Sequence, residues 1–169
     1  TNKSTAVAED DTGPSGFDLS ALTSWFDDTN DDQAANSGSS SHTFQGIILS
    51  SNAATSSQGV WQYRTSSSGT WTPVPDLSSN AFFLDEDAEI RFVPVLHYNG
   101  DVGELSYYVV DSGGGSSIPT TENTTSTTSG SYISASLNTF DATITPSNDK
   151  PIATDVSLSN TITEDADEP

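Results

Sequence analysis

Short runs of apolar and β-branched residues, separated by turn-forming residues, set the pattern of this chain. Over residues 59–65, apolar and polar side chains alternate with the period of two expected of a strand with one buried face. A Ser-Gly turn follows, and Trp71 opens a second short run, so residues 59–74 are predicted to form a β-hairpin. Further strands are expected at residues 43–49, 81–84, 88–95 and 104–110, with one or two more within 131–145. This succession of short strands predicts an all-β fold, a β-sandwich.

Three segments depart from the strand pattern. Residues 18–26 favour a short helix, with Ser15 or Asp18 as its N-cap. Residues 27–42 are acidic and then rich in Ser, Gly and Asn, while residues 112–131 are rich in Ser, Thr and Gly. Loops of this length are uncommon unless they are functional or lack fixed structure. We expect the second of them to be a solvated loop over its last part, from residue 120 to 130.

Two turns are marked by residue type. The acidic turn Asp85-Glu86-Asp87 separates the strands expected at 81–84 and 88–95. Asn99-Gly100 is a strong signal for a tight β-hairpin. Asp101 follows it, and either completes that turn or ligates an ion.

The two ends of the chain resemble each other. Residues 4–10 read Ser-Thr-Ala-Val-Ala-Glu-Asp, and residues 159–165 read Ser-Asn-Thr-Ile-Thr-Glu-Asp. Such similarity predicts a tandem array, although seven residues can also match by chance. We therefore expect one domain over residues 1–151, and a linker with the first strand of a following repeat over residues 152–169.

The charge of the chain is extreme. It carries 24 Asp and Glu against 4 Lys and Arg, which gives a formal net charge of −20. A folded protein with this charge repels itself, and bound divalent cations would relieve the repulsion. The charge also argues against nucleic acid and against direct contact with an anionic membrane. Plain solubility is the alternative explanation of the acid excess.

Cysteine is absent, so no disulfide holds the fold and a thiol active site is excluded. A Ser/Thr/Asp/Gly-rich chain of this kind is typical of secreted bacterial surface proteins. We therefore expect an extracellular, surface-anchored location on a bacterium. His42 and His97 are the only imidazoles, and no hydrolase, nucleotide-binding or metalloprotease motif is present. The chain is expected not to be an enzyme.

The strongest local motif is an acidic segment that begins at Asp27. Its residues Asp28, Asn30 and Asp32 have the spacing D-x-N-x-D, which directs alternate oxygens towards one centre, as a calcium site requires. Asp27 and Asp31 add two further carboxylates. The motif is not an EF-hand, because its sixth position is Gln rather than Gly. Calcium binding and a merely solvated acidic loop are the two interpretations.

A second group of acidic residues lies at the domain edges. Glu9, Asp10 and Asp11 open the domain, and Asn148 and Asp149 close it. Such residues can share a calcium ion at the joint between two repeats. A polar linker restricted by the following proline is an equally good interpretation. Weaker calcium candidates are Asp101, Asp111, Asp85 and Asp87.

Several segments resemble the cadherin-like repeats of large bacterial RTX adhesins. The resemblance rests on Gly59-Val60-Trp61-Gln62-Tyr63, Gly69-Thr70-Trp71, Phe83-Leu84-Asp85, Ile90-Arg91-Phe92-Val93-Pro94, Tyr98-Asn99-Gly100, Leu105-Ser106-Tyr107 and the ending Asn148-Asp149-Lys150-Pro151. Val110 stands where these repeats usually have Trp. The unit is longer than an ordinary repeat, and the additional length at 17–42 and 112–131 is similar to the peptide-binding domain of some of these adhesins.

The resemblance implies a calcium-binding β-sandwich of the cadherin-like or Ig-like type that grips the free C-terminal end of a short peptide, with Ca²⁺ taking part. The expected partners are peptide or protein C-termini on another cell or surface, together with neighbouring repeats of the same chain, which is expected to be monomeric. Tyr63, Arg64, Tyr98 and Tyr108 are candidate ligand contacts, although each also suits a core or strand position. The alternatives are a calcium-stiffened spacer repeat and a calcium-dependent carbohydrate-binding module.

Overall fold

The computed structural model describes residues 3–29, 36, 40–119, 123–125 and 131–153. The expected calcium ligands Asn30, Asp31 and Asp32 lie outside the described residues, as does the expected start of a following repeat after residue 153. The described strands form two sheets, which confirms the all-β sandwich class. In the described part of the chain, no helix is long and apolar enough to cross a membrane.

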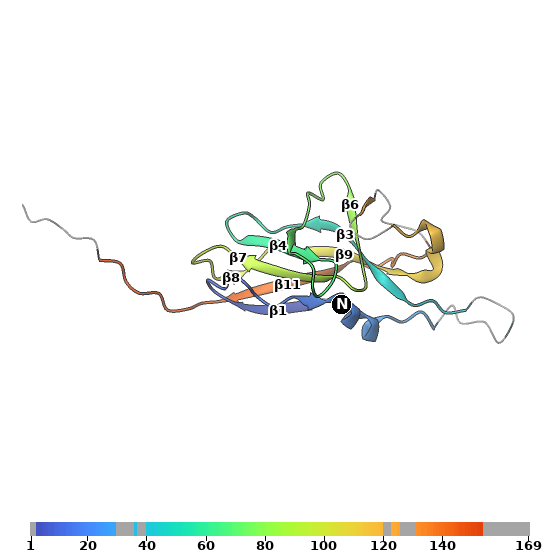
Figure 1. Cartoon of the computed structure of the whole chain (residues 1–169), viewed down its shortest axis with the longest axis horizontal. Helices are drawn as coiled ribbons and strands as arrows, with labels where there is room; N and C mark the ends of the chain where they lie inside the picture. Colours follow the sequence, from blue (N-terminus) through green and yellow to red (C-terminus); the bar gives the residue numbers. More distant parts are fainter. Residues whose placement is uncertain (1–2, 30–35, 37–39, 120–122, 126–130, 154–169) are drawn as a thin grey trace, which may run out of the picture.

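The elements follow one another along the chain with short strands predominating (Figure 1). In order they are β1 (Lys3–Ala8), β2 (Phe17–Asp18), the 3-10 helix η1 (Leu19–Trp25), β3 (Phe44–Asn52), β4 (Gly59–Arg64), β5 (Thr72–Pro73), β6 (Ala81–Asp85), β7 (Glu89–Pro94), β8 (Gly100–Asp101), β9 (Leu105–Asp111), the 3-10 segment η4 (Ser112–Ser117), β10 (Asn123–Thr125) and β11 (Asn138–Thr145).

The larger sheet has the strand order β1-β11-β9-β3-β6-β10, with β8 also pairing with β11. The smaller sheet has the order β2-β7-β4-β5. The acidic turn after Asp85 carries the chain from β6 in the first sheet to β7 in the second. The strand β1 runs parallel to β11 over six residue pairs, whereas the other pairs are antiparallel.

The main core lies between the two sheets and is rich in aromatic rings. Trp61 packs edge-on against Phe92, with ring centroids 5.2 Å apart, and its indole N–H donates to the Gly103 carbonyl at 3.0 Å. Tyr107 stacks on Phe140 at 4.4 Å. These rings come from both sheets, and their burial holds the sheets together because apolar area removed from water is the main stabilising contribution in folding.

A second apolar cluster covers the outer face of the larger sheet. It consists of Ile48, Ala81, Phe83, Val110 and Ile133. Because successive strand side chains point to opposite faces, β3 buries Ile47 in the main core and Ile48 in this second cluster, and both are fully buried. The segment that returns from η4 to β11 therefore packs against the sheet through Ile133.

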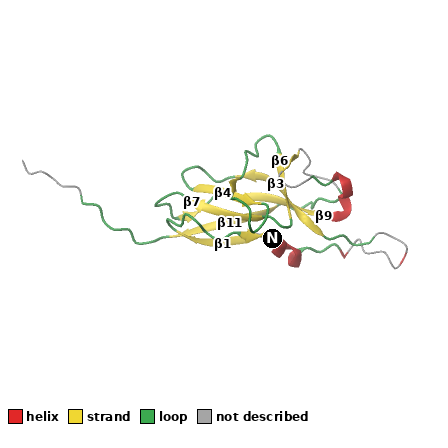
Figure 2. Cartoon of the chain, viewed as in Figure 1, coloured by secondary structure: helices red, strands yellow, loops and turns green. Residues whose placement is uncertain are grey.

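The sequence-based helix is present and short. Asp18 is its N-cap, since its side chain accepts a hydrogen bond from the Ser20 amide at 2.9 Å. Figures 1 and 2 show η1 and η4 at one end of the sandwich, which we call the loop end. The turn before β8 and the outgoing segment after β11 lie at the opposite end, which we call the linker end.

Two expectations about loops need correction. Asn99-Gly100 does not form a tight hairpin, because the turn lies earlier, closed by the Tyr98 amide donating to the Val95 carbonyl at 3.1 Å. Gly100 instead belongs to β8, which pairs with β11. The expected solvated loop over 120–130 contains a strand, since β10 pairs with β6. The predicted hairpin over 59–74 is confirmed by the pairing of β4 with β5.

Candidate functional site

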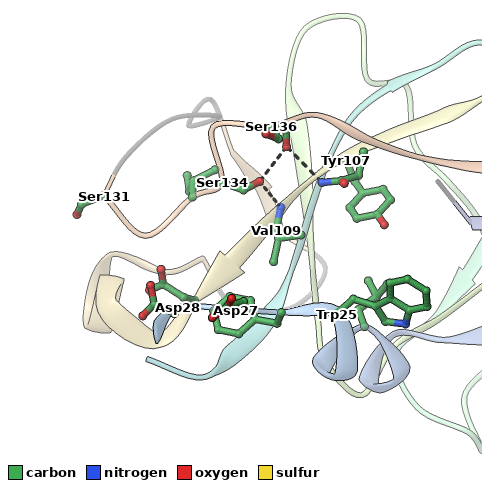
Figure 3. A pocket seen from close by; sticks show the side chains of 13 residues that line it. Trp25, Asp27, Asp28, Tyr107, Val109, Ser131, Ser134 and Ser136 are labelled. Atoms are coloured by element: carbon green, nitrogen blue, oxygen red, sulfur yellow. Dashed lines mark hydrogen bonds between the residues drawn. The ribbon is translucent and has the colours of Figure 1, made fainter. Parts of the chain in front are cut away.

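A cleft of about 470 Å³ opens at the loop end of the sandwich. We call it the loop-end cleft. Its lining combines aromatic, aliphatic, hydroxyl and acidic side chains, contributed by Leu22, Trp25, Phe26, Asp27, Asp28, Tyr107, Val109, Asp111, Ser131, Ile133, Ser134, Ser136 and Asn138. Figure 3 shows Trp25, Asp27 and Asp28 on one side, facing Val109 and the serines on the other.

One wall of the cleft is built by η1 and the residues that follow it. Leu22 anchors the helix in the core, being only 4% exposed, while Trp25 is 60% exposed. The Lys3 ammonium lies 3.7 Å from the centroid of the Trp25 ring. This cation–π contact joins β1 to η1 and fixes the orientation of the indole. An exposed, oriented tryptophan at a cleft is a common anchor for a ligand.

The acidic rim of the cleft is organised by backbone amides. Asp27 accepts from the Thr29 amide at 3.0 Å and hydroxyl at 2.7 Å, and these bonds lower the pKa of its carboxyl, the hydroxyl having the larger effect. Asp28 accepts from the His42 amide at 2.7 Å, and Asp111 accepts from the Gly113 amide at 2.6 Å. Each carboxylate uses one oxygen in these bonds, so the orientation of each is fixed.

Asp28 and Asp111 approach each other through His42. The Asp28 carboxylate lies 3.4 Å from the His42 ring nitrogen Nδ1, and this carboxylate is only 18% exposed. A side chain added at Gly113 would meet both the His42 ring and the Asp111 carboxylate, which places these groups against each other. The rim therefore concentrates negative charge where the start of β3 meets the end of β9.

The opposite wall is formed by β9 and the segment that precedes β11. Ser134 bridges them, because its hydroxyl accepts from the Val109 amide at 2.9 Å and donates to the Ser136 carbonyl at 3.0 Å (Figure 3). Tyr107 forms part of the floor, and burial raises its pKa to about 12. Its ring stacks on Phe140, which fixes its position in the floor.

A second group of polar side chains gathers at the linker end, and we call it the linker-end cluster. It comprises Glu9, Asp10, His97, Asn99 and Asp149. Glu9 is buried, and its two oxygens accept from the Asn99 side chain at 3.2 Å and the Ser147 amide at 2.8 Å. His97 Nδ1 lies 2.8 Å from Asp149 and 3.8 Å from Asp10.

The linker-end cluster has the donors of a metal site. Ligand atoms of Glu9, Asp10 and His97 lie within 4.8 Å of one another, so one ion could contact all three. Carboxylates suit Ca²⁺, whereas an imidazole also suits transition metals, so the donor set is not specific for Ca²⁺. The structure brings together Glu9, Asp10 and Asp149, which the sequence analysis grouped at the domain edges, and their place at a joint between repeats stays a prediction. The sequence gave no signal for His97, which approaches from the turn before β8.

The remaining metal candidates are placed apart from these contacts. One Asp11 oxygen accepts from the Gly13 amide at 2.9 Å, and one Asp101 oxygen accepts from the Thr143 hydroxyl at 2.9 Å. Asn148 is exposed in the outgoing segment. For these three residues the structure describes turn and strand contacts, and their part in ion binding stays a prediction.

The four predicted ligand contacts do not line the loop-end cleft. Tyr63 is in the core against Phe82, and Arg64 binds Glu89 at 2.7 Å on the outer face of the smaller sheet. Tyr98 donates to the Asp101 carbonyl at the linker end, and Tyr108 packs against the second apolar cluster. The sequence analysis did not single out Trp25, although its position just before an acidic segment was an available signal.

The fold and its two polar sites define a β-sandwich with a cleft at one end and a cluster of metal-ligand type at the other. Comparison of the chain with models of known protein families, with characterised proteins and with solved structures finds no match.

Proposed function

We propose that this chain is a calcium-dependent adhesion module of a bacterial RTX adhesin, which binds the C-terminal end of a peptide or protein on a target surface. The observation that carries this proposal is the loop-end cleft. One of its walls comes from the additional stretch 17–42, Ser131 at the end of the other additional stretch also lines it, and its lining includes Asp27 and Asp28, which begin the acidic segment. The module acts outside the cell, binds its ligand without chemical conversion, and needs no nucleic acid or membrane partner.

The cleft has the size and lining of a site for a short extended peptide. Trp25 offers an exposed ring, Leu22 and Val109 an apolar wall, and Ser134 and Ser136 polar groups. Ligand sites commonly combine an apolar surface with a few polar groups that fix orientation. A volume of about 470 Å³ accommodates two or three residues rather than a folded surface.

A peptide carboxylate requires a cation at this place. The chain has a formal charge of −20, and Asp27, Asp28 and Asp111 line the cleft. A calcium ion held by the acidic segment supplies the missing positive charge and, with an open coordination position, accepts the carboxylate directly. Calcium at the linker-end cluster would serve the joint between repeats instead.

The decisive experiment compares immobilised peptides that differ only in a free or amidated C-terminus. We expect the intact chain to bind the peptide with a free C-terminus when calcium is present, and to release this peptide when a chelator is added. Trp25→Ala should weaken binding about tenfold, since truncating an aromatic anchor commonly costs this much or more. Leu96→Ala is the matched control, because Leu96 is similarly exposed, at 68%, but lies at the linker end.

Other outcomes identify the alternatives. Equal binding of free and amidated peptides would contradict carboxylate capture. Binding to no peptide, together with calcium-dependent stiffening of the linker end, would leave a spacer repeat. Calcium-dependent retention on a glycan panel through Trp25 would favour a carbohydrate-binding module, for which an exposed indole is also suited.

A further inference from the structure

The loop-end cleft is more acidic than a site that binds only the carboxylate of a ligand would need to be. Its described lining residues include Asp27, Asp28 and Asp111 but neither Lys nor Arg. The Lys3 ammonium contacts Trp25 from β1, and Lys3 does not line the cleft. The rim thus stays acidic although much of the lining is apolar.

A single calcium ion does not neutralise this acid. The described lining holds three carboxylates, those of Asp27, Asp28 and Asp111, and a captured C-terminus adds a fourth negative charge. One Ca²⁺ supplies two positive charges. Two negative charges therefore remain at the cleft after calcium is bound, and a cationic group on the ligand would balance them.

The shape of the cleft suits a long basic side chain. Its apolar lining, with Leu22 and Phe26 on one wall and Val109 on the opposite wall, fits an aliphatic stem. Lysine and arginine bury such stems along apolar surfaces while their charged heads stay at a polar rim. Trp25 adds an electron-rich ring face, and its contact with Lys3 shows that the ring accepts a cation at 3.7 Å. The fixed Asp111 carboxylate lies at the rim as an acceptor for the head group.

We infer that the loop-end cleft receives a lysine or arginine side chain of the bound polypeptide, with the stem against Leu22, Phe26 and Val109 and the cationic head between Trp25 and Asp111. This inference rests on the proposed function, since it assigns a side-chain preference to the same peptide site. It makes the module selective for a basic residue close to the C-terminus of its partner.

The test uses Gly/Ala tetrapeptides that carry one arginine at the last, second-last or third-last position. Each is compared with its citrulline counterpart, a neutral isostere, and each is made with a free and an amidated C-terminus. Affinities for the intact chain are measured by calorimetry in calcium. At one or more positions we expect arginine to bind about tenfold more tightly than citrulline, as a hydrogen-bonded charge commonly contributes this much.

The Asp111→Asn variant tests whether the arginine preference comes from this carboxylate or from the overall negative charge of the protein. The substituted amide keeps an oxygen that accepts from the Gly113 amide while the charge is lost, and Asp111 lies outside the D-x-N-x-D motif. We expect the arginine preference to fall about threefold to fivefold, as for a partly exposed ion pair. The control is Asp76→Asn, which removes the same charge near Ser51 and Asn52, away from the cleft.

The outcomes distinguish the two proposals. Equal affinity for arginine and citrulline, with free C-termini still preferred, overturns this inference and leaves carboxylate capture standing. A preference for arginine that Asp76→Asn reduces as much as Asp111→Asn also overturns it, because the attraction is then unspecific. Equal affinity for free and amidated peptides contradicts the proposed function alone, and binding to none of the peptides overturns both.

Discussion

Gly46 shows how closely single residues are constrained at the start of β3. Its φ of +147° lies in the region that favours glycine, and an added Cβ would come within 2.2 Å of the Leu84 carbonyl oxygen. The register between β3 and β9 shifts between Phe44 and Gly46. The close approach of β6 at this point therefore depends on the missing side chain.

Gly46→Ala should lower the free energy of unfolding by about 2–3 kcal/mol, because both steric overlap and backbone strain oppose the alanine. Urea denaturation in calcium measures the change. Gly100→Ala is the control, since Gly100 also has a positive φ, +110°, but its Cβ would meet nothing within 4 Å. Equal losses in the two variants would show that only backbone strain matters.

For single residues, the sequence predicts which strand positions share a face better than it predicts which side chains contact each other. The alternation over 59–65 places Trp61 and Tyr63 on the same face, and both are buried. It does not predict that Arg64 binds Glu89 or that Arg64 and Arg91 stack on Trp71, at 4.6 and 4.2 Å. Those contacts depend on the register of β4 against β7 and on the position of a separate strand, and neither is encoded in a local pattern.

Among the elements, the return from η4 to β11 stabilises the larger sheet. Ile133 is 8% exposed and forms a bridge with Val110, and it also lines the loop-end cleft. It therefore connects the second apolar cluster with the wall of the cleft. The stretch around it contains few other apolar residues.

Ile133→Ala should destabilise the fold by about 2 kcal/mol or more, because it removes most of a buried aliphatic side chain and leaves a cavity. Leu137→Ala, four residues further along, should change stability by less than about 0.5 kcal/mol, since Leu137 is 52% exposed. Thermal unfolding of the two variants gives the comparison. A similar, small change in both would mean that this segment contributes little to the fold.

The predictability of the elements follows their length. The longer strands β3, β4, β7 and β9 each extend over enough residues for an alternating or apolar run to be recognised. The strands β2, β8 and β10 have two or three residues, too few for a period, and exist because a neighbouring strand offers hydrogen bonds. Part of the cleft was predictable from Asp27 and Asp28, whereas its opposite wall required the tertiary packing of β9.

The net charge of the whole molecule, formally −20, destabilises the folded state because like charges repel each other. Carboxylates are concentrated both at the linker-end cluster and at the loop-end cleft. An ion that binds only the folded chain stabilises it by mass action, by about 2.7 kcal/mol when its free concentration is 100 times the dissociation constant. For a domain of this size that corresponds to roughly 5–10 °C in melting temperature.

Chelation should therefore lower the melting temperature by roughly 5–10 °C. Asp10→Asn should reduce this calcium-dependent gain while changing the chelated protein little. Asparagine tolerates the positive φ of position 10, 65°, and keeps an acceptor for the His97 amide, now 2.8 Å from Asp10.

Calorimetric scans with calcium and with chelator provide the measurement, and Asp76→Asn again serves as a charge-matched control. A melting temperature that is insensitive to chelator would assign the acid excess to solubility. An unchanged calcium response in Asp10→Asn would place the stabilising ion elsewhere than the linker-end cluster.

The parallel pairing of β1 with β11 has a mechanical consequence. Six residue pairs, from Lys3 with Phe140 to Ala8 with Thr145, join the first and last strands side by side. Because the two strands point the same way, a pull on the two ends of the chain slides one strand along the other. The hydrogen bonds between them are then loaded together in shear rather than opened one after another, so the module resists extension at the two strands through which tension enters and leaves it.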